Sequence, residues 1–411
     1  MRPTLSPVPI EASVSARLSR MPAPVLVGLA LLAAAAVGFG IGAFDPPFGG
    51  RVSSDAVADW VTTRAAVEGL DPYGNVSELA SQFDQVYVSP GPEAMGPERL
   101  IHPRLPGMLL LQVPWALLPF EIAVPVAGLS ALLGFAVAIW SVAQLVGGRP
   151  SVALLVLPLL VAHPFVRFAI MFGNSGAWLG ALVIGALIMI RRGRQIPAGI
   201  LLGIAALLRV FPLLFLVLTW RRGHRVATLS GAATFVLANM AGITVFRIAP
   251  IQVVEALRAS GAAWLEFPWN LSLVPRITGL VGEGGGIVSI LVALGLTWLV
   301  ARSAFNESRA WAIVGVVGLL LSPISWDSYR SLLVLPFALL WSTRLAGSRV
   351  FVLVGVLVPY LIWSAGANLV SMAQAVIEVT LIGVLASFGA GAMTAGQRAY
   401  AVEGGASCST G

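Results

Sequence analysis

The sequence contains no lysine, and it has only one cysteine and three histidines in 411 residues. With Cys408 as the only thiol, an internal disulfide and a cysteine-based metal site are both excluded. Charged residues make up 10% of the chain, against roughly a quarter in an average soluble protein. This scarcity of charge excludes an ordinary soluble domain. The scattered arginines give no support for nucleic-acid binding.

Hydrophobic residues account for 58% of the chain and gather in long apolar runs. The first run, residues 22–43, is long enough to span a bilayer and too long for the core of a signal peptide. We predict an all-α polytopic membrane protein, with about 11 to 13 transmembrane or re-entrant segments. A single transmembrane domain covers residues 22–390, between an N-terminal tail (1–21) and a C-terminal tail (391–411).

The distribution of charge predicts the orientation of the chain. Arginines precede the first apolar run, so the positive-inside rule places the N-terminus in the cytoplasm. The interval 44–103 contains nine acidic residues and three arginines, and we expect it outside the cell membrane. The same alternation places residues 248–285 outside and the C-terminal tail inside. This topology predicts a multi-pass plasma-membrane protein.

Two arginine clusters, at residues 191–194 and 221–225, are both expected on the cytoplasmic side. The apolar run between them, 196–219, therefore cannot cross the membrane once. Arg209 and Pro212 lie near its middle, which predicts two half-helices that enter and return. A charge inside an apolar hairpin is costly and usually functional, with a purely structural pairing as the alternative.

A similar parity problem affects residues 104–190, where an odd number of crossings is needed but four apolar segments are visible. One segment must be short, broken or re-entrant. His163-Pro164 and Gly173-Asn174 are both candidate break points.

Residues 51–73 begin the longest polar interval. A helix over 54–69 would place Asp55, Asp59 and Thr62 on one stripe beside an apolar stripe. Ser53 or Ser54 can cap its start, Gly69 can end it, and Asp71-Pro72 indicates a turn. We expect this helix to lie flat on the membrane surface and present a carboxylate. The alternative is a solvated juxtamembrane helix without a function in chemistry.

Carboxylates, arginines and tryptophans are predicted to gather at the outer face. Tryptophan stacks on sugars and arginine pairs with phosphate oxygens, so the set suits a ligand that combines the two. An aromatic belt with snorkelling arginines is the alternative. The set is Asp55, Asp59, His102, Arg104, Trp269, Asn270, Arg276, Trp326, Asp327 and Arg330.

Several short motifs over residues 50–345 resemble those of glycosyltransferase family 87, of the GT-C superfamily. In chain order they are Asp55 with Trp60 and GLDPY (69–73), HPR (102–104), GNSG (173–176), RVFP (209–212), NLS (270–272) with Arg276, and SPISW (322–326). The chain departs from the family in having Asp327-Ser328-Tyr329 where many members have Asp-His-His, and His-Pro-Arg for Tyr-Pro-Pro.

The resemblance implies a GT-C-like bundle that transfers a sugar from a polyprenyl-phosphate donor to a lipid or glycan hydroxyl, with inversion. It implies mannose as the sugar and Asp55 as the catalytic base, with Asp59 one turn on as its competitor. The implied substrate contacts are Asp59, Trp60, His102, Arg104, Asn174, Arg209, Asn270, Arg276, Trp326, Asp327 and Arg330. No metal or other cofactor is expected. Arabinofuranosyl transfer, a lipid-sugar transporter or flippase, and a non-catalytic relative are the alternatives.

Overall fold

The regular elements of the protein are all helical over the part of the chain that the computed structural model describes. This part comprises residues 22–23, 25–30, 33, 55–83, 103–162, 164–265, 272–322 and 331–342. Three of its helices are long and apolar enough to cross a membrane, namely α6 (Phe120–Leu145), α13 (Arg225–Phe246) and α16 (Gly285–Arg302). The prediction of an all-α polytopic membrane protein is confirmed.

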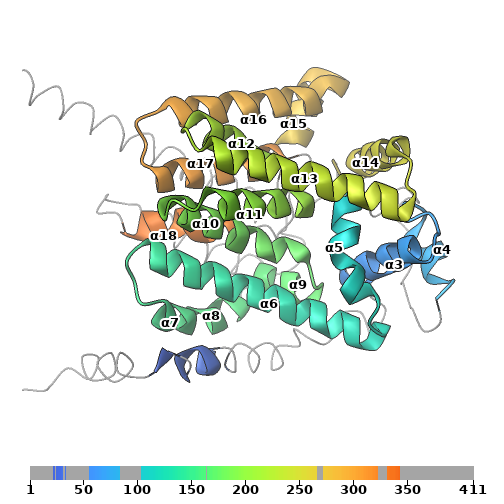
Figure 1. Ribbon diagram of the computed structural model, residues 1–411, viewed down its shortest axis with the longest axis horizontal. Coiled ribbons are helices and arrows are strands. Elements are labelled where there is room, and N and C mark those ends of the chain that lie inside the picture. Colours follow the sequence, from blue (N-terminus) through green and yellow to red (C-terminus); the bar gives the residue numbers. More distant parts are fainter. Residues whose placement is uncertain are drawn as a thin grey trace, which may run out of the picture.

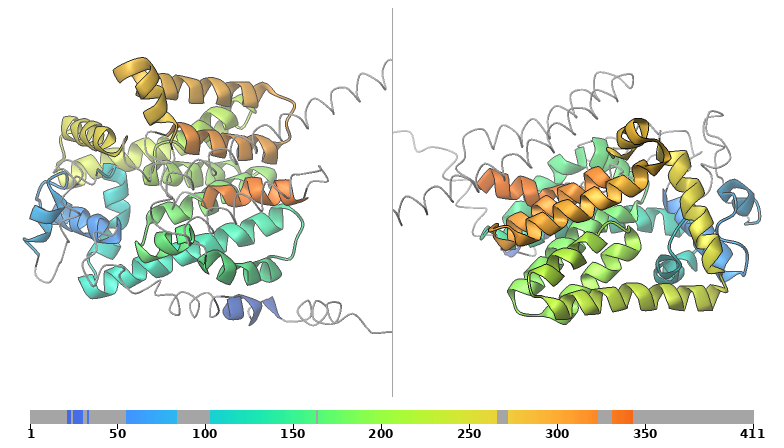
Figure 2. Two further views of the ribbon diagram at one scale, coloured as in Figure 1. Left: turned by 180° about the vertical axis from the view of Figure 1, so that it is seen from behind. Right: turned by 90° about the horizontal axis from the view of Figure 1, so that it is seen from above.

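The core lies between these long helices and four others, α10 (Trp178–Arg191), α11 (Gln195–Leu208), α12 (Leu213–Arg221) and α17 (Glu307–Leu321). Figures 1 and 2 show the helices running roughly side by side. Phe215 of α12 and Trp311 of α17 are almost fully buried, with ring centroids 5.1 Å apart. Apolar side chains on the outer faces of α13 and α16 remain exposed, as expected for surfaces that face lipid.

The apolar run around Arg209 forms two half-helices, as predicted. The first, α11 (Gln195–Leu208), is roughly 21 Å long, and α12 is roughly 14 Å long, at 1.5 Å per residue. Neither is long enough for a hydrocarbon core of about 30 Å. Both arginine clusters therefore lie at one end of the bundle, and Arg209 lies at the turn between the half-helices.

Within residues 104–190, the first apolar segment forms a short helix, α5 (Pro106–Ala116), which fits the expected short or re-entrant segment. Its length of roughly 17 Å is insufficient to span. The segment after α6 is broken into four pieces that end at the turn of Gly173 and Asn174, and His163 lies outside the described residues. The pieces are α7 (Pro150–Ala153), η2 (Leu154–Val156), α8 (Leu157–Ala162) and α9 (Pro164–Met171).

Close backbone contact fixes α5 against α13. A Cβ atom on Gly242 would lie 2.2 Å from the carbonyl oxygen of Pro106, so only glycine fits at this crossing. The backbone N–H of Gly107 also donates to Oδ1 of Asn239, at 3.1 Å. Small residues at a helix crossing are typical of membrane bundles, where packing rather than the hydrophobic effect drives association.

The polar stretch after the first apolar run folds into α3 (Asp55–Val67) and α4 (Val76–Ala80). The alternative of a solvated helix is wrong, whereas a helix that lies flat on the membrane and presents a carboxylate stays a prediction. Nine of its 13 residues are buried, both Asp59 and Thr62 among them. The reason is that α5, α6 and α4 all pack on it, so both stripes are covered (Figure 1).

Two further helices, α14 (Pro250–Leu265) and α15 (Val274–Val281), follow α13. Val253 and Ala256 of α14 are buried against Ala66 of α3 and Leu109 of α5. The end of the bundle that carries α3, α4, α5 and α14 is called the α3 end below (Figure 1). The remaining elements are η3 (Ser175–Ala177), η4 (Gly282–Gly284) and α18 (Val334–Ser342).

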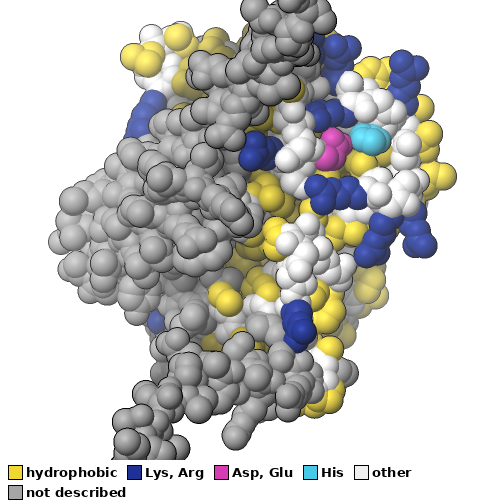
Figure 3. Space-filling model, turned by 90° about the vertical axis from the view of Figure 1, so that its left-hand side faces the viewer, with side chains coloured by type: hydrophobic (Ala, Val, Ile, Leu, Met, Phe, Trp, Pro, Cys, Tyr) yellow, Lys and Arg dark blue, Asp and Glu magenta, His cyan; other side chains and the backbone are white. Residues whose placement is uncertain are grey.

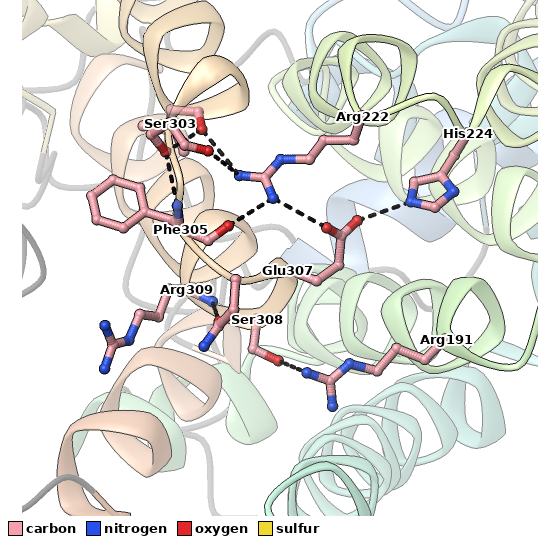
Figure 4. Close-up of polar contacts among 10 residues, drawn as sticks. Arg191, Arg222, His224, Ser303, Phe305, Glu307, Ser308 and Arg309 are labelled. Carbon is pink, nitrogen blue, oxygen red and sulfur yellow. Dashed lines mark hydrogen bonds and ion pairs between the residues drawn. The ribbon is translucent and has the colours of Figure 1, made fainter. Parts of the chain in front are cut away.

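The opposite end, called the arginine-rich end, carries Arg191, Arg192, Arg194, Arg221, Arg222, Arg225, Arg302 and Arg309. At this end, hydrogen bonds from Arg222 connect α12 to the loop between α16 and α17 (Figure 4). Its guanidinium donates to the carbonyl oxygens of Phe305, at 2.7 Å, and Val300, at 3.2 Å. Glu307 accepts from Arg222 at 3.5 Å and lies 3.1 Å from Nε2 of His224.

Candidate functional site

Asp55 is the first residue of α3 and is half-buried. The next residue fixes its position, because the backbone N–H of Ala56 donates to the carbonyl oxygen of Phe172 at 2.8 Å. This bond ties the start of α3 to the turn that follows α9. A carboxylate in the first turn of a helix interacts favourably with the helix dipole.

The turn that meets Asp55 depends on Gly173. Its φ of +59° lies in the left-handed region that other residues rarely adopt. A Cβ atom there would also lie 2.7 Å from the Cβ atoms of both Ala56 and Ala127. Glycine is therefore required for α3, α6 and the turn to approach one another. This explains why the motif at 173–176 begins with glycine.

Asn174 follows and is buried, with 2% of its surface exposed. Its backbone N–H donates to the carbonyl oxygen of Ala169, at 2.9 Å, and its Oδ1 accepts from the backbone N–H of Gly176, at 2.7 Å. These two bonds fix the side-chain amide, whose Nδ2 donates to Oδ2 of Asp55.

Arg209 reaches the same amide from the opposite side. Its Nη2 donates to Oδ1 of Asn174 at 3.4 Å, and its Nη1 donates to the carbonyl oxygen of Leu208 at 2.7 Å. Residues from α3, the turn after α9 and the α11–α12 turn thus meet in one line, Asp55–Asn174–Arg209. A carboxylate and a guanidinium are held on two sides of one buried amide. Such an arrangement can accept a proton at one position and stabilise a negative charge at another.

Asp59 and Arg104, predicted as substrate contacts, form an ion pair in the interior. Nε of Arg104 donates to Oδ1 of Asp59 at 2.5 Å, and the two side chains are 7% and 2% exposed. Each buried charge is compensated by the other, because neither is hydrated by water. The pair joins α3 to the residues just before α5.

The GLDPY motif supports this ion pair. The side chain of Asp71 accepts from the backbone N–H of Tyr73, at 3.0 Å, and closes the predicted turn. The hydroxyl of buried Tyr73 donates to the carbonyl oxygen of Arg104 at 2.9 Å. Burial, and secondly the negative charge of Asp71, raise the pKa of the Tyr73 phenol, so that it stays a hydrogen-bond donor.

Trp60 also lies in the interior. Its ring packs edge-on against Phe83 and Phe120, with centroids 5.7 and 5.4 Å away, and its indole N–H donates to the carbonyl oxygen of Leu118. These contacts fasten α3 to the start of α6. The structure therefore gives Trp60 a packing role, and a sugar contact for this side chain stays a prediction.

Described residues on both sides of SPISW (322–326) contact other parts of the bundle, although most of this motif and of NLS lies outside the described residues. The backbone N–H of Leu273 donates to the carbonyl oxygen of Leu320, at 2.7 Å, two residues before SPISW. On the other side of SPISW, Oγ of Ser331 donates to the carbonyl oxygen of Gly176 at 3.3 Å and accepts from the backbone N–H of Gly180 at 3.0 Å. Both flanks of the motif are thus anchored near the site.

The other predicted residues divide into two groups. Arg276 is exposed on α15, and the structure describes no contact between it and Asp55, Asn174 or Arg209. Six lie outside the described residues: His102, Trp269, Asn270, Trp326, Asp327 and Arg330. Among the described residues, no group of three or more His, Cys, Asp or Glu side chains could hold a metal ion.

The sequence analysis missed Arg167, a half-buried arginine in the middle of apolar α9. It lies two residues before Ala169, whose carbonyl oxygen accepts from Asn174. Val166, Ala169 and Ile170 of the same helix are buried in one apolar cluster with Leu132 and Phe135, in the middle of α6. An intramembrane arginine is a signal of function, and it could have been found from its apolar flanks in the sequence.

Comparison with known proteins gives one match. The model of glycosyltransferase family 87 matches residues 105–323, more than half of the chain. No curated protein and no solved structure matches. The matched range contains Asn174 and Arg209, whereas Asp55 and α3 precede it. Together with the apolar helices, this match identifies the chain as a member of glycosyltransferase family 87, a family of membrane glycosyltransferases.

Proposed function

We propose that this glycosyltransferase transfers mannose from a polyprenyl-phosphate donor to a hydroxyl group of a lipid or glycan acceptor at the α3 end. The observation that carries this proposal is that Asp55 and Arg209 bind the same side chain, Asn174. Three segments that are distant in the sequence bring the proposed base and the proposed phosphate ligand together. The family supports sugar transfer, and the placement of charges supports a donor with a phosphate leaving group.

In the proposed reaction, Asp55 accepts the proton of the acceptor hydroxyl as its oxygen attacks the anomeric carbon. The bond from that carbon to the phosphate oxygen breaks, and the polyprenyl phosphate leaves with the electron pair. A direct displacement of this kind inverts the anomeric carbon. General-base catalysis contributes about 10²–10⁴-fold.

Arg209 stabilises the negative charge that develops on the departing phosphate. A guanidinium offers several donors in a fixed plane, which suits two phosphate oxygens at once. Arg167 is a second cation, half-buried on α9, the helix that leads into the turn of Asn174. We propose that it assists Arg209, because a prenyl phosphate carries its charge at the boundary of the apolar region.

A transfer assay tests the proposal. Membranes that contain the protein are given radiolabelled polyprenyl-phosphate mannose, and the lipid and glycan fractions are separated. We expect label in an acceptor product, with inverted configuration at the anomeric carbon. Label that appears only from polyprenyl-phosphate arabinose would contradict the choice of mannose. Donor movement between leaflets without any product would contradict transfer itself and favour a flippase.

A further inference from the structure

The arginine-rich end has an excess of positive charge that its described carboxylates do not neutralise (Figure 3). Among the residues that the structure describes, Glu307 is the one acidic residue on this face. It is already bound to Arg222 and His224 (Figure 4). Arg221 and Arg225 form no ion pair with any described residue, and both are exposed. Unneutralised guanidinium groups attract anions.

Two of these arginines lie on tryptophan rings at one corner, formed where α12 ends, α13 begins and α16 ends. The guanidinium carbon of Arg221 is 3.9 Å from the ring centroid of Trp298 in α16. That of Arg225 is 5.6 Å from the ring centroid of Trp220 in α12. The rings hold the arginine stems in place and leave the N–H groups at their edges available.

A third arginine and a helix terminus add to the positive charge at this corner. Arg302 follows Trp298 by four residues, and thus lies on the same face of α16. The corner also contains the N-terminus of α13, whose first backbone N–H groups carry a partial positive charge.

Exposed apolar side chains border the corner directly. Leu299 of α16 is 64% exposed and Leu229 of α13 is 62% exposed, while Trp298 and Trp220 are 41% and 46% exposed. Tryptophan is typical of the boundary between headgroups and acyl chains. An anion bound here would therefore have apolar surface beside it on two long helices. A soluble anion makes no favourable contact with this apolar surface, whereas the acyl chains of a lipid can pack against it.

We propose that this corner binds the headgroup of an anionic phospholipid in the leaflet that meets the arginine-rich end. The phosphate lies between Arg221, Arg225 and Arg302, and the acyl chains lie along α13 and α16. This site is at the opposite end of the bundle from Asp55 and does not depend on the proposed transfer reaction.

The test is native mass spectrometry of the full-length protein, released from micelles that contain phosphatidylglycerol and phosphatidylcholine. We expect retained phosphatidylglycerol on the natural protein. The Arg221→Gln/Arg225→Gln variant should bind it roughly fivefold more weakly for each arginine removed. Arg221→Lys/Arg225→Lys keeps the charge and should retain most of the lipid, which separates loss of charge from loss of folding.

Arg192→Gln/Arg194→Gln is the matched control, because it removes the same charge from exposed positions at the same end. It should keep the lipid at the natural level. An equal loss in the corner variant and the control would mean that the lipid follows net charge, and would overturn the proposal. Unchanged binding in the corner variant, or displacement of the lipid by soluble glycerol phosphate at equal concentration, would also overturn it.

Discussion

At the residue scale, the turn at Gly173 positions Asn174, and Asn174 in turn positions Asp55 and Arg209 relative to each other. We expect Gly173→Ala to push the turn away from Ala56 and Ala127, because the new Cβ atom would lie 2.7 Å from both. A misplacement of about 1 Å at a site can cost about 10²-fold in rate. The initial rate of sugar transfer measures this loss.

Gly193→Ala is the control for this substitution. Gly193 also has a positive φ, of +72°, but has nothing within 4 Å of the position of a Cβ atom. It therefore introduces the backbone strain without the steric clash, and transfer should stay near the natural rate. If both variants lose transfer equally, strain rather than the position of Asn174 is responsible.

The buried pair of Asp59 and Arg104 leads to a second prediction at this scale. Asp59→Asn would leave the guanidinium of Arg104 buried and without its carboxylate, which costs about 3–5 kcal/mol. Thermal unfolding in detergent should show a marked decrease in melting temperature. Arg104→Gln in the same chain should restore part of the stability, because the effects of paired residues are not additive.

A different outcome would change the assignment of the base. If Asp59→Asn unfolds at the natural temperature but loses sugar transfer, then Asp59 acts on substrate. In that case the motif alignment is wrong by one helical turn.

Several site residues were predictable from the sequence and others were not, for physical reasons. Asp55, Asn174 and Arg209 were chosen from motifs and from the cost of a charge in an apolar run, and the structure brings them together. Helical periodicity also placed Asp59 on the stripe of Asp55, but periodicity does not indicate what covers a face. Here α5 and α6 cover it, so Asp59 forms an ion pair in the interior and Trp60 packs between aromatic rings.

At the scale of elements, the α11–α12 hairpin places Arg209 beside Asn174, where we propose that it binds the donor phosphate. Arg209→Ala should reduce transfer by about 10²–10³-fold, the usual loss when one donor to a developing negative charge is removed. Arg209→Lys should keep part of the activity, since its charge remains but the planar pair of donors is lost. Steady-state kinetics at varied donor concentration measures both effects.

Arg149→Ala is the control for the hairpin variants, because Arg149 is exposed and follows the end of α6 that contacts Arg192, at the arginine-rich end and not at the Arg209 turn. Full activity in both Arg209 variants would show that this arginine only supports the turn. The proposed contact with phosphate would then be wrong.

The elements differ in how well the sequence predicts them. The hairpin follows from two arginine clusters that must lie on one side, so charge alone predicts it. The shortness of α5 does not follow from apolar composition alone, because the run continues through Leu117 and Leu118 until Pro119. Only the packing of α3 and α13 against α5 shows that this helix stays at one end.

At the scale of the whole molecule, the separation of charge predicts the orientation. The described acidic residues Asp55, Asp59, Glu68, Asp71 and Glu78 belong to the α3 end, together with Arg64 and Arg104, whereas the arginine-rich end carries eight arginines beside Glu307. We expect the α3 end outside the cell. In a Cys408→Ser background, an impermeant thiol reagent should label Ser81→Cys in intact cells and should label Ala304→Cys only after lysis. The reverse pattern would contradict the placement of the site on the outer face.

The number of membrane segments stays a prediction, because the last two apolar runs, 350–364 and 368–390, lie outside the described residues. The fold class was predictable because apolar length is a strong signal in a chain with 10% charge.

The most direct test of the account is the effect of Asp55→Asn on sugar transfer. The substitution is nearly isosteric and removes the proton acceptor, so transfer should fall by about 10²–10⁴-fold while binding of the donor persists. Glu68→Gln is the matched control, since it makes the same chemical change on an exposed carboxylate just after α3. It should leave transfer unchanged. Near-normal transfer by Asp55→Asn, with a competent donor and acceptor supplied, would contradict the proposed mechanism.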